Sequence, residues 1–275
     1  MTPRSWLFVP ADSERKIARA LESDADAIIF DLEDSVVPDK KKAAREILKN
    51  LPKRSNGPQW WVRVNPIGSK FHKDDLGLIR SAYVHGIVLP KAETGDDVTQ
   101  LAHRTGAIPI HAIVTETAAS LFGLLTYRDP ASPLVAMSWG AEDLSAALGA
   151  SSKYDSNGEL SFTYRLARSL CLAGAVAAGV QPVDGVFADY RDEEGLRAEA
   201  EAARREGFTG KLAIHPAQVA VINGAFTPSA DDVRHAEAIV AAFEAQPDAG
   251  VLSVDGKMVD RPHLVQARRV LERSR

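Results

Sequence analysis

The sequence lacks several features that would place the protein in a broad class. It has one cysteine, Cys171, among 275 residues, so no disulfide can form within the chain, and a cytoplasmic location is expected. It has no run of about 18 apolar residues, so no membrane-spanning helix is expected. The 33 Lys and Arg do not outnumber the 37 Asp and Glu, which argues against nucleic acid as the main partner.

Two more absences concern the fold and the chemistry. A Rossmann-type dinucleotide-binding sheet has a glycine-rich turn after its first strand, whereas Val9-Pro10-Ala11-Asp12 contains no glycine. Histidine and cysteine are nowhere spaced as zinc ligands. The sequence therefore favours neither a dinucleotide fold nor a zinc site.

What the chain does have is an alternation of short apolar runs with longer segments of helical periodicity. Continuous apolar runs are typical of parallel strands that are buried on both faces. Eight such units, in a chain not far above the roughly 250 residues of this fold, predict a TIM (β/α)₈ barrel. The predicted strands are residues 6–9, 27–30, 60–65, 86–91, 108–116, 134–139, 183–187 and 212–216. Predicted helices between them include 13–22, 38–51 and 193–206.

The last part of the chain is more than a barrel requires. Its periodicity predicts a helix over 230–245, a hairpin over 250–259 around Asp255-Gly256, and a final helix over 262–273. We therefore expect a barrel domain over residues 1–225 and a C-terminal helical extension, or lid, over 226–275.

Acidic residues gather after three of the predicted strands. They are Glu33, Asp34, Glu116, Glu142 and Asp143. The active site of a TIM barrel lies at the carboxyl ends of the strands, so these acids are expected around one mouth. A single acid there could merely cap the next helix, but a cluster of like charges requires a cation. Mg²⁺, which takes carboxylate and water oxygens, is the first choice, and Mn²⁺ is possible.

Positive and small residues lie near these acids. Arg63 follows the third strand and is predicted to grip the carboxylate of an anionic substrate; the alternative is that it only balances charge. Lys91 either counters the acids or acts in the site. Backbone amides from Ala141 to Asp143 follow a turn of small residues and can approach a ligand. The lysine run 40–42 is interpreted as a solvated helix face.

Several of these segments together resemble a known family, the citrate lyase beta-subunit-like proteins of the HpcH/HpaI aldolase and malyl-CoA lyase group. The matching motifs occur in order over nearly the whole chain. They lie at residues 5–10, 31–36, 62–65, 89–91, 116–118, 140–144 and 213–218.

The resemblance implies roles for particular residues. Glu116 and Asp143 would bind Mg²⁺, Arg63 would hold a keto-acid carboxylate, and Glu33 with Asp34 would orient metal-bound waters and the arginine. Residues 256–262 look like the lid segment of acyl-CoA lyases in this group. There an aspartate from a neighbouring subunit completes the site, which makes Asp260 the candidate acid/base and implies a homotrimer or hexamer. The alternative for Asp260 is a cap on the helix that opens at Pro262.

The expected function is that of a Mg²⁺-dependent carbon–carbon lyase of the oxo-acid-lyase type. It would cleave or form a 3-hydroxy-acyl-CoA such as citramalyl-CoA or malyl-CoA, with a 2-keto acid and acetyl-CoA as the other partners. Three alternatives stay open: a citrate lyase beta subunit acting on an acyl-carrier protein, an aldolase acting on free hydroxy-keto acids, and a non-catalytic metal-binding barrel. The aldolase relatives use a histidine base, and no histidine lies beside the early acidic motif.

Overall fold

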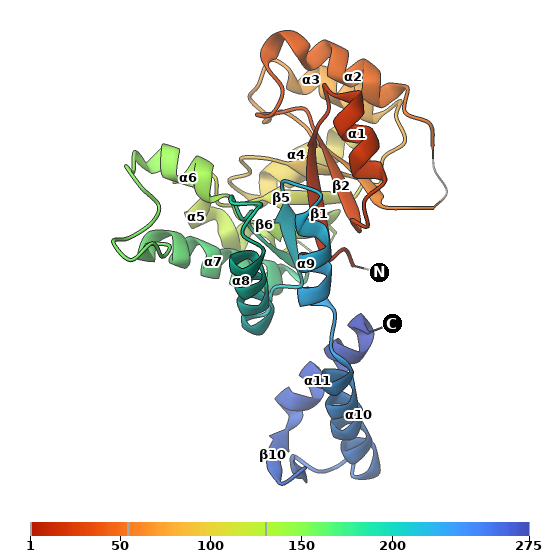
Figure 1. The fold of residues 1–275 in the computed structure, drawn as a ribbon, viewed down its shortest axis with the longest axis vertical. Helices are drawn as coiled ribbons and strands as arrows, with labels where there is room; N and C mark the ends of the chain where they lie inside the picture. The colour runs from red at the N-terminus through yellow and green to blue at the C-terminus, as the bar shows by residue number, and fades with distance from the viewer. Residues whose placement is uncertain (1, 54–55, 130, 275) are drawn as a thin grey trace. The chain divides into compact units, whose positions relative to one another are not determined.

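The computed structural model describes residues 2–53, 56–129 and 131–274 of the chain (Figure 1). Contacts divide the chain into two compact units, Pro3–Asn223 and a second unit that begins at Gly224. Each unit has its own hydrophobic core. Among the described residues, no helix is long and apolar enough to cross a membrane.

The first unit is a closed barrel of eight strands that pair in chain order, and all of the pairs are parallel. The barrel closes where Ser5 of the first strand pairs with Lys211 of the last. The expected TIM barrel is therefore confirmed. Its strands are β1 (Ser5–Pro10), β2 (Ala27–Asp31), β3 (Gln59–Arg63), β4 (Gly86–Leu89), β5 (Ile110–Ile113), β6 (Leu134–Ser138), β7 (Gln181–Asp184) and β8 (Gly210–Ala213).

Several strands end earlier than the apolar runs suggest. Strand β4 ends at Leu89, before Pro90, which has no N–H for the ladder. Strand β5 ends at Ile113, so Glu116 lies in the loop that follows it. These shorter strands leave Lys91 and Glu116 in loops at the carboxyl end of the barrel.

Helices follow the strands, and several begin where the sequence places a cap. Ser13 accepts a hydrogen bond from the backbone N–H of Lys16 at 3.4 Å at the start of the first helix. The helices of this part are α1 (Glu14–Leu21), α2 (Lys41–Lys49), α3 (His72–Ile79), α4 (Gly95–Thr105), α5 (Ser120–Gly123), α6 (Ala141–Leu148), α7 (Phe162–Ala178), α8 (Glu193–Glu206) and α9 (Gln218–Phe226). Two short 3₁₀ helices are η1 (Pro38–Lys40) and η2 (Leu124–Tyr127).

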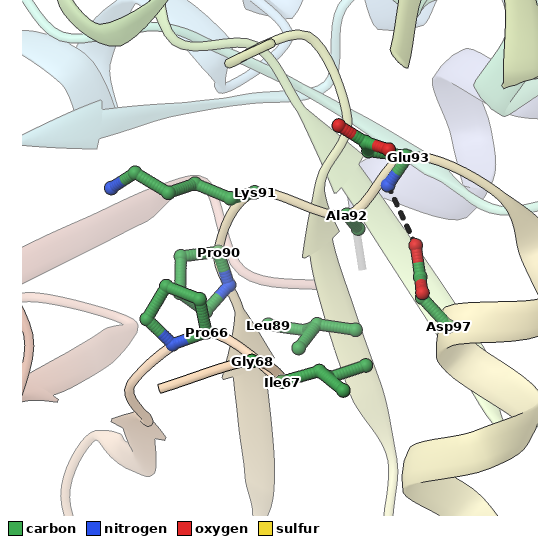
Figure 2. Close-up of a pocket in the computed structure, with 9 residues that line it drawn as sticks. All are labelled: Pro66, Ile67, Gly68, Leu89, Pro90, Lys91, Ala92, Glu93 and Asp97. Atoms are coloured by element: carbon green, nitrogen blue, oxygen red, sulfur yellow. Dashed lines mark hydrogen bonds between the residues drawn. The ribbon is translucent and has the colours of Figure 1, made fainter. Parts of the chain in front are cut away.

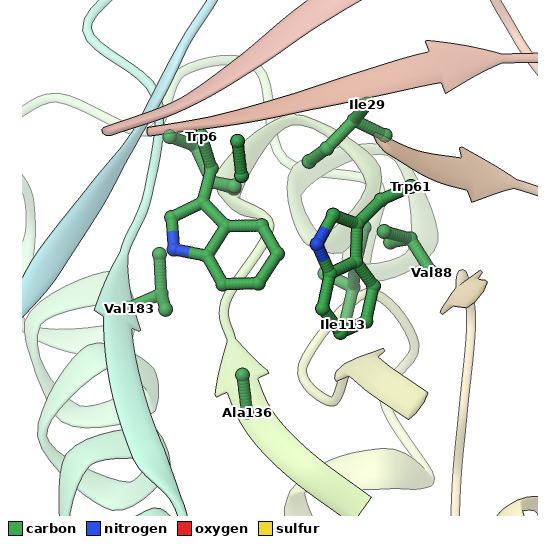
Figure 3. Packing of buried hydrophobic residues seen from close by; sticks show 9 residues of the cluster. Trp6, Ile29, Trp61, Val88, Ile113, Ala136 and Val183 are labelled. Atoms are coloured by element: carbon green, nitrogen blue, oxygen red, sulfur yellow. The ribbon is translucent and has the colours of Figure 1, made fainter. Parts of the chain in front are cut away.

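Large side chains fill the interior of the barrel (Figure 3). The rings of Trp6 and Trp61 meet edge to face with centroids 4.9 Å apart. A Cβ at Gly86 would lie 2.1 Å from Cζ3 of Trp61, so β4 needs glycine at this point. The interior is therefore a packed core, and a ligand must bind at one end of the barrel.

The second unit is a helical hairpin with a small sheet. It contains α10 (Ala230–Ala245), the antiparallel strands β9 (Val251–Val254) and β10 (Lys257–Asp260), and α11 (Arg261–Arg273). The turn between the strands has positive φ at Asp255 (52°) and Gly256 (75°), as a two-residue hairpin turn requires. Ile239, Phe243 and Leu264 are buried in its core. That this unit completes the site of a neighbouring subunit stays a prediction.

Candidate active site

Three acids lie at the carboxyl ends of the strands, as the sequence suggests. Glu33 follows β2, Glu116 follows β5, and Asp143 is in the first turn of α6. Glu33 and Glu116 are each only 3% exposed. Burying carboxylates at one mouth is costly unless cations or hydrogen-bond donors compensate them. The neighbours of these acids therefore determine what the site can do.

Glu116 is the least compensated of the three. Its Oε2 accepts a hydrogen bond from the backbone N–H of Lys91 at 2.5 Å. Burial, followed by the nearby charges of Glu33 and Asp143, raises the pKa of Glu116 to about 8 against the opposing effects of Lys91 and Arg63. The loop after β6 lies close against this side chain, because a Cβ at Gly140 would be 2.7 Å from Cγ of Glu116.

Lys91 brings together acids that follow three different strands, β2, β5 and β6. Its Nζ lies 2.5 Å from Glu33 Oε1, 3.1 Å from Asp34 Oδ2 and 3.2 Å from Asp143 Oδ1. Lys91 also has a φ of 52°, which a non-glycine residue rarely adopts and which costs of order 1 kcal/mol. In this backbone conformation, the N–H of Lys91 donates to Glu116 while its ammonium group pairs with the other acids. We name Glu33, Asp34, Arg63, Lys91, Glu116 and Asp143 the mouth cluster.

Arg63 is held rigidly by Asp31, a partner that the sequence pattern does not single out. Asp31 accepts hydrogen bonds from Nε at 2.7 Å and from Nη2 at 2.6 Å, and Nη1 lies 3.0 Å from Oε2 of Glu33. Burial alone would raise the pKa of Asp31, but the charge and hydrogen bonds of Arg63 outweigh it and lower that pKa. The guanidinium also lies over the ring of Phe8 at 4.7 Å. A guanidinium has five N–H donors, so its Nη1 and Nη2 keep N–H groups for a further anion.

The loop that carries Glu33 is fixed by a buried lysine. Lys41 is only 5% exposed, and its Nζ donates to the carbonyl oxygens of Leu32 at 2.6 Å and Glu33 at 2.7 Å. Asn65 also donates to the carbonyl of Leu32, at 2.9 Å. The interpretation of residues 40–42 as a solvated helix face is therefore wrong for Lys41, because its side chain folds back onto the loop after β2 and binds backbone acceptors that helical periodicity does not reveal.

Other predicted residues lie differently. The side chain of Glu142 is 63% exposed and forms an ion pair with Lys153, while that of Asp34 is 60% exposed at the rim. Ala141 opens α6, so its role as a substrate contact depends on its backbone. Asp260 belongs to the second unit, where it caps α11, and its Oδ1 lies 2.5 Å from Nδ1 of His263. Capping and proton transfer do not exclude each other.

The donor set at the mouth suits a hard divalent cation. The described residues contain no group of three or more His, Cys, Asp or Glu arranged to hold a metal ion. Mg²⁺ does not need one, because it is usually bound through one or two carboxylates while water and substrate oxygens complete the octahedron. The raised pKa of Glu116 reports negative charge that its neighbours leave uncompensated. Glu116 and Asp143 are therefore the residues that could hold such an ion.

A pocket opens beside this cluster (Figure 2). It has a volume of about 230 Å³ and lies between the loops that follow β3 and β4. Pro66, Ile67, Leu89 and Pro90 give it apolar walls. The pocket shares Lys91 with the mouth cluster, although the side chain of Lys91 points away from these walls (Figure 2).

Comparisons with known proteins agree with this geometry. The family model described as HpcH/HpaI aldolase/citrate lyase matches residues 4–216. The barrel with its acidic mouth thus belongs to an enzyme of the carbon–carbon lyase class. The chain is a member of the HpcH/HpaI aldolase/citrate lyase family.

Relatives of named function cover nearly the whole chain. A (3S)-malyl-CoA thioesterase from Cereibacter sphaeroides (strain KD131 / KCTC 12085) is 38% identical, over 98% of this chain and 94% of that protein. A mitochondrial citramalyl-CoA lyase from Rattus norvegicus is 33% identical, over 98% and 85%. The crystal structure of CitE from Mycobacterium tuberculosis in complex with magnesium, acetoacetate and coenzyme A superposes with a TM-score of 0.85 at 35% identity, over 98% and 97% of the two chains.

Proposed function

We propose that this protein is a Mg²⁺-dependent carbon–carbon lyase that cleaves or forms a 3-hydroxy-acyl-CoA, such as citramalyl-CoA or malyl-CoA. The products of cleavage are a 2-keto acid and acetyl-CoA. The observation that carries this proposal is that Glu116, Asp143 and an oriented Arg63 lie close together at the carboxyl end of the barrel. The binding of magnesium, acetoacetate and coenzyme A by the related CitE supports it.

Glu116 and Asp143 are the proposed metal ligands. When bound, Mg²⁺ would supply a Lewis acid for the substrate oxygen on which negative charge develops, and Mn²⁺ is the alternative ion. Glu33 and Asp34 keep the role of orienting metal-bound water. Lys91 holds Glu33, Asp34 and Asp143 in place through its ammonium group.

Arg63 is proposed to bind the carboxylate of the keto-acid half. Its contacts with Asp31 and Glu33 fix the plane of the guanidinium before substrate arrives, so little side-chain entropy is lost on binding. Backbone N–H groups of Ala141, Glu142 and Asp143, at the start of α6, are proposed to bind the same anion, which the positive end of the helix dipole would favour. Together these groups orient the bond that breaks.

Asp260 of a neighbouring subunit is the proposed acid/base. In condensation its carboxylate would remove a proton from the acetyl-CoA methyl group, and in cleavage it would return that proton to the enolate. The hydrogen bond from His263 lowers the pKa of Asp260, which favours the ionised form needed for condensation. This arrangement requires an oligomer, which we propose to be a homotrimer or hexamer, and light scattering that finds a monomer would contradict it. The cytoplasmic location stays a prediction.

Asp260→Asn tests the acid/base role. We expect turnover to fall by about a hundredfold to ten-thousandfold, because general acid–base catalysis contributes that much. Mg²⁺ affinity, measured by calorimetry, should stay unchanged. Unchanged turnover would leave Asp260 with its capping role alone.

The decisive experiment is a substrate screen with Mg²⁺ and purified protein. Malyl-, citramalyl-, citryl- and 3-hydroxy-3-methylglutaryl-CoA are incubated separately, and keto acid, acetyl-CoA and free CoA are quantified. Keto acid together with acetyl-CoA supports the lyase. Free CoA together with the intact hydroxy acid supports thioester hydrolysis, which is a second candidate because a malyl-CoA thioesterase is 38% identical.

A carrier-dependent lyase, an aldolase and a non-catalytic barrel would all be inactive on these CoA esters, so three further assays separate them: turnover with an acyl-carrier partner, cleavage of free hydroxy-keto acids, and Mg²⁺ binding. A citrate lyase beta subunit, such as the relative from Leuconostoc mesenteroides at 30% identity, would need its acyl-carrier partner and stay inactive on soluble CoA esters. An aldolase would cleave free hydroxy-keto acids. A non-catalytic barrel would bind Mg²⁺ and turn over none of these compounds.

A further inference from the structure

The first turn of α6 carries Asp143, so whatever fixes the turn between β6 and α6 also fixes this acid. Strand β6 ends at Ser138, and Trp139 and Gly140 connect it to α6. On one side, the backbone of Gly140 touches Glu116. On the other side, Trp139 is only 5% exposed and turns its indole toward β7.

The indole of Trp139 has a defined seat. Its Nε1 donates a hydrogen bond to Oδ1 of Asp184, at the end of β7, at 2.8 Å. Its ring lies on Gly185, where a Cβ would be 2.9 Å from Nε1 and 3.0 Å from Cε2. A glycine is therefore required under the ring, and both a polar and a steric contact hold the indole.

Asp184 is itself immobilised by two cations. Lys211 Nζ lies 2.9 Å from its Oδ2, and Arg168 Nε donates to its Oδ1 at 2.8 Å. Lys211 and Asp184 are both fully buried. Lys211 also binds Glu199 at 2.6 Å, and Arg168 pairs with Glu206. We name these five residues the wall cluster; it joins β7 and β8 to α7 and α8.

We propose that the hydrogen bond from Trp139 to Asp184 sets the position of Asp143 relative to Glu116, which makes Trp139 and Asp184 positioning residues for the metal pair. The inference rests on the proposed metal-binding role of these two acids. In this proposal the wall cluster fixes the position of Asp184, and Asp184 in turn fixes the indole of Trp139. The hydrogen bond from the Val114 N–H to the Ser138 carbonyl, at 2.9 Å, ties the ends of β5 and β6 and completes the frame.

Trp139→Phe is the variant that tests this. It removes the donor while Asp184 keeps both of its cations, so the barrel should still fold. We expect the affinity for Mg²⁺ or Mn²⁺, measured by titration calorimetry well below the melting temperature, to fall by about tenfold to a hundredfold, which is the usual effect of outer-shell partners. The value of kcat at saturating metal should stay within about threefold of the parent, because the reacting groups are intact.

Two further variants sharpen the test. Gly185→Ala pushes on the indole and should weaken metal binding in the same direction. Trp6→Phe makes the same chemical change inside the barrel, where Trp6 Nε1 has no hydrogen-bond partner among the described residues, and should leave metal affinity unchanged. A Trp139→Phe protein with a lower melting temperature but parental metal affinity would overturn the inference, because its role would then be structural alone.

The inference and the proposed function can fail separately. If the parent binds Mg²⁺ and Trp139→Phe binds it equally well, only the positioning role is lost. If neither protein binds Mg²⁺ or Mn²⁺, the metal site falls and the positioning role falls with it.

Discussion

The mouth cluster and the wall cluster both combine acids with lysine and arginine, yet they differ in how completely charge is matched. In the wall cluster, burial would raise the pKa of Asp184, but Lys211 and Arg168 outweigh it and lower that pKa well below its ordinary value. In the mouth cluster, Glu116 has its pKa raised to about 8. The wall cluster, in which Asp184 is compensated by cations, stabilises the fold. The mouth cluster, in which Glu116 is not, can still bind a cation.

Asp184→Ala should have the largest effect, as a lower free energy of unfolding. Removing Asp184 takes away the buried partner of Lys211 and Arg168 and leaves them only the more exposed Glu199 and Glu206, and breaking such a buried pair costs about 3–5 kcal/mol. Chemical denaturation measures this cost as a lower free energy of unfolding. A loss below about 1 kcal/mol would show that the wall cluster does not anchor the barrel end.

Glu116→Gln should do the opposite at the mouth. It removes an uncompensated carboxylate, so the melting temperature should stay the same or rise. Mg²⁺ affinity should fall by at least about a hundredfold, since even the loss of an outer partner costs tenfold to a hundredfold. Glu194→Gln, on the exposed face of α8, is the matched control. Parental Mg²⁺ affinity in Glu116→Gln would remove Glu116 from the metal site.

His111 adds a third environment, because it is buried and no charged side chain among the described residues pairs with it. Burial lowers its pKa to about 3, and its Nε2 lies 2.9 Å from Ser138 Oγ. Below about pH 6.5 the imidazole of His111 is protonated in the unfolded chain but stays neutral in the folded protein, so the free energy of unfolding falls as pH falls. His111 should therefore contribute a loss of about 2 kcal/mol between pH 7 and pH 5. His111→Gln should flatten this dependence, and an identical pH profile would refute it.

Arg63→Lys should give the smallest effect. A lysine keeps the positive charge beside Asp31 but cannot form the bidentate contact, so it cannot present a fixed planar donor group to the substrate carboxylate. We expect KM for the keto acid in condensation to rise at least about tenfold, which corresponds to one charged hydrogen bond. The KM for acetyl-CoA is the internal control. Equal rises in both constants would mean general disruption of the mouth cluster.

Much of the fold could be predicted, because it depends on local pattern. Continuous apolar runs separated by helical periodicity are enough to count eight strands, and the cap at Ser13 and the turn at Asp255-Gly256 are visible as short motifs. The ends of the strands are less predictable. Strand β5 stops at Ile113, because pairing with its neighbours, rather than apolar content, decides where a strand ends.

Within the site, position along the chain identifies the acids but not their partners. Glu33, Glu116 and Asp143 are recognisable because each follows a strand. Asp31 is hidden at the end of an apolar run, and its pairing with Arg63 across neighbouring strands is the signal that could have found it. Lys41 looks like a surface residue in the sequence but is buried in the structure.

The sequence by itself determined the barrel, the family and the strand ends at which the acids lie, because these depend on residue type and spacing along the chain. Only the tertiary structure decided how charge is shared among them. In the tertiary structure Asp31 pairs with Arg63, Lys91 pairs with acids of the mouth cluster, and Asp184 pairs with cations of the wall cluster. Such pairs join segments that are far apart in the sequence. Burial, together with the charges of the neighbouring side chains, then set the pKa values that distinguish the mouth cluster from the wall cluster.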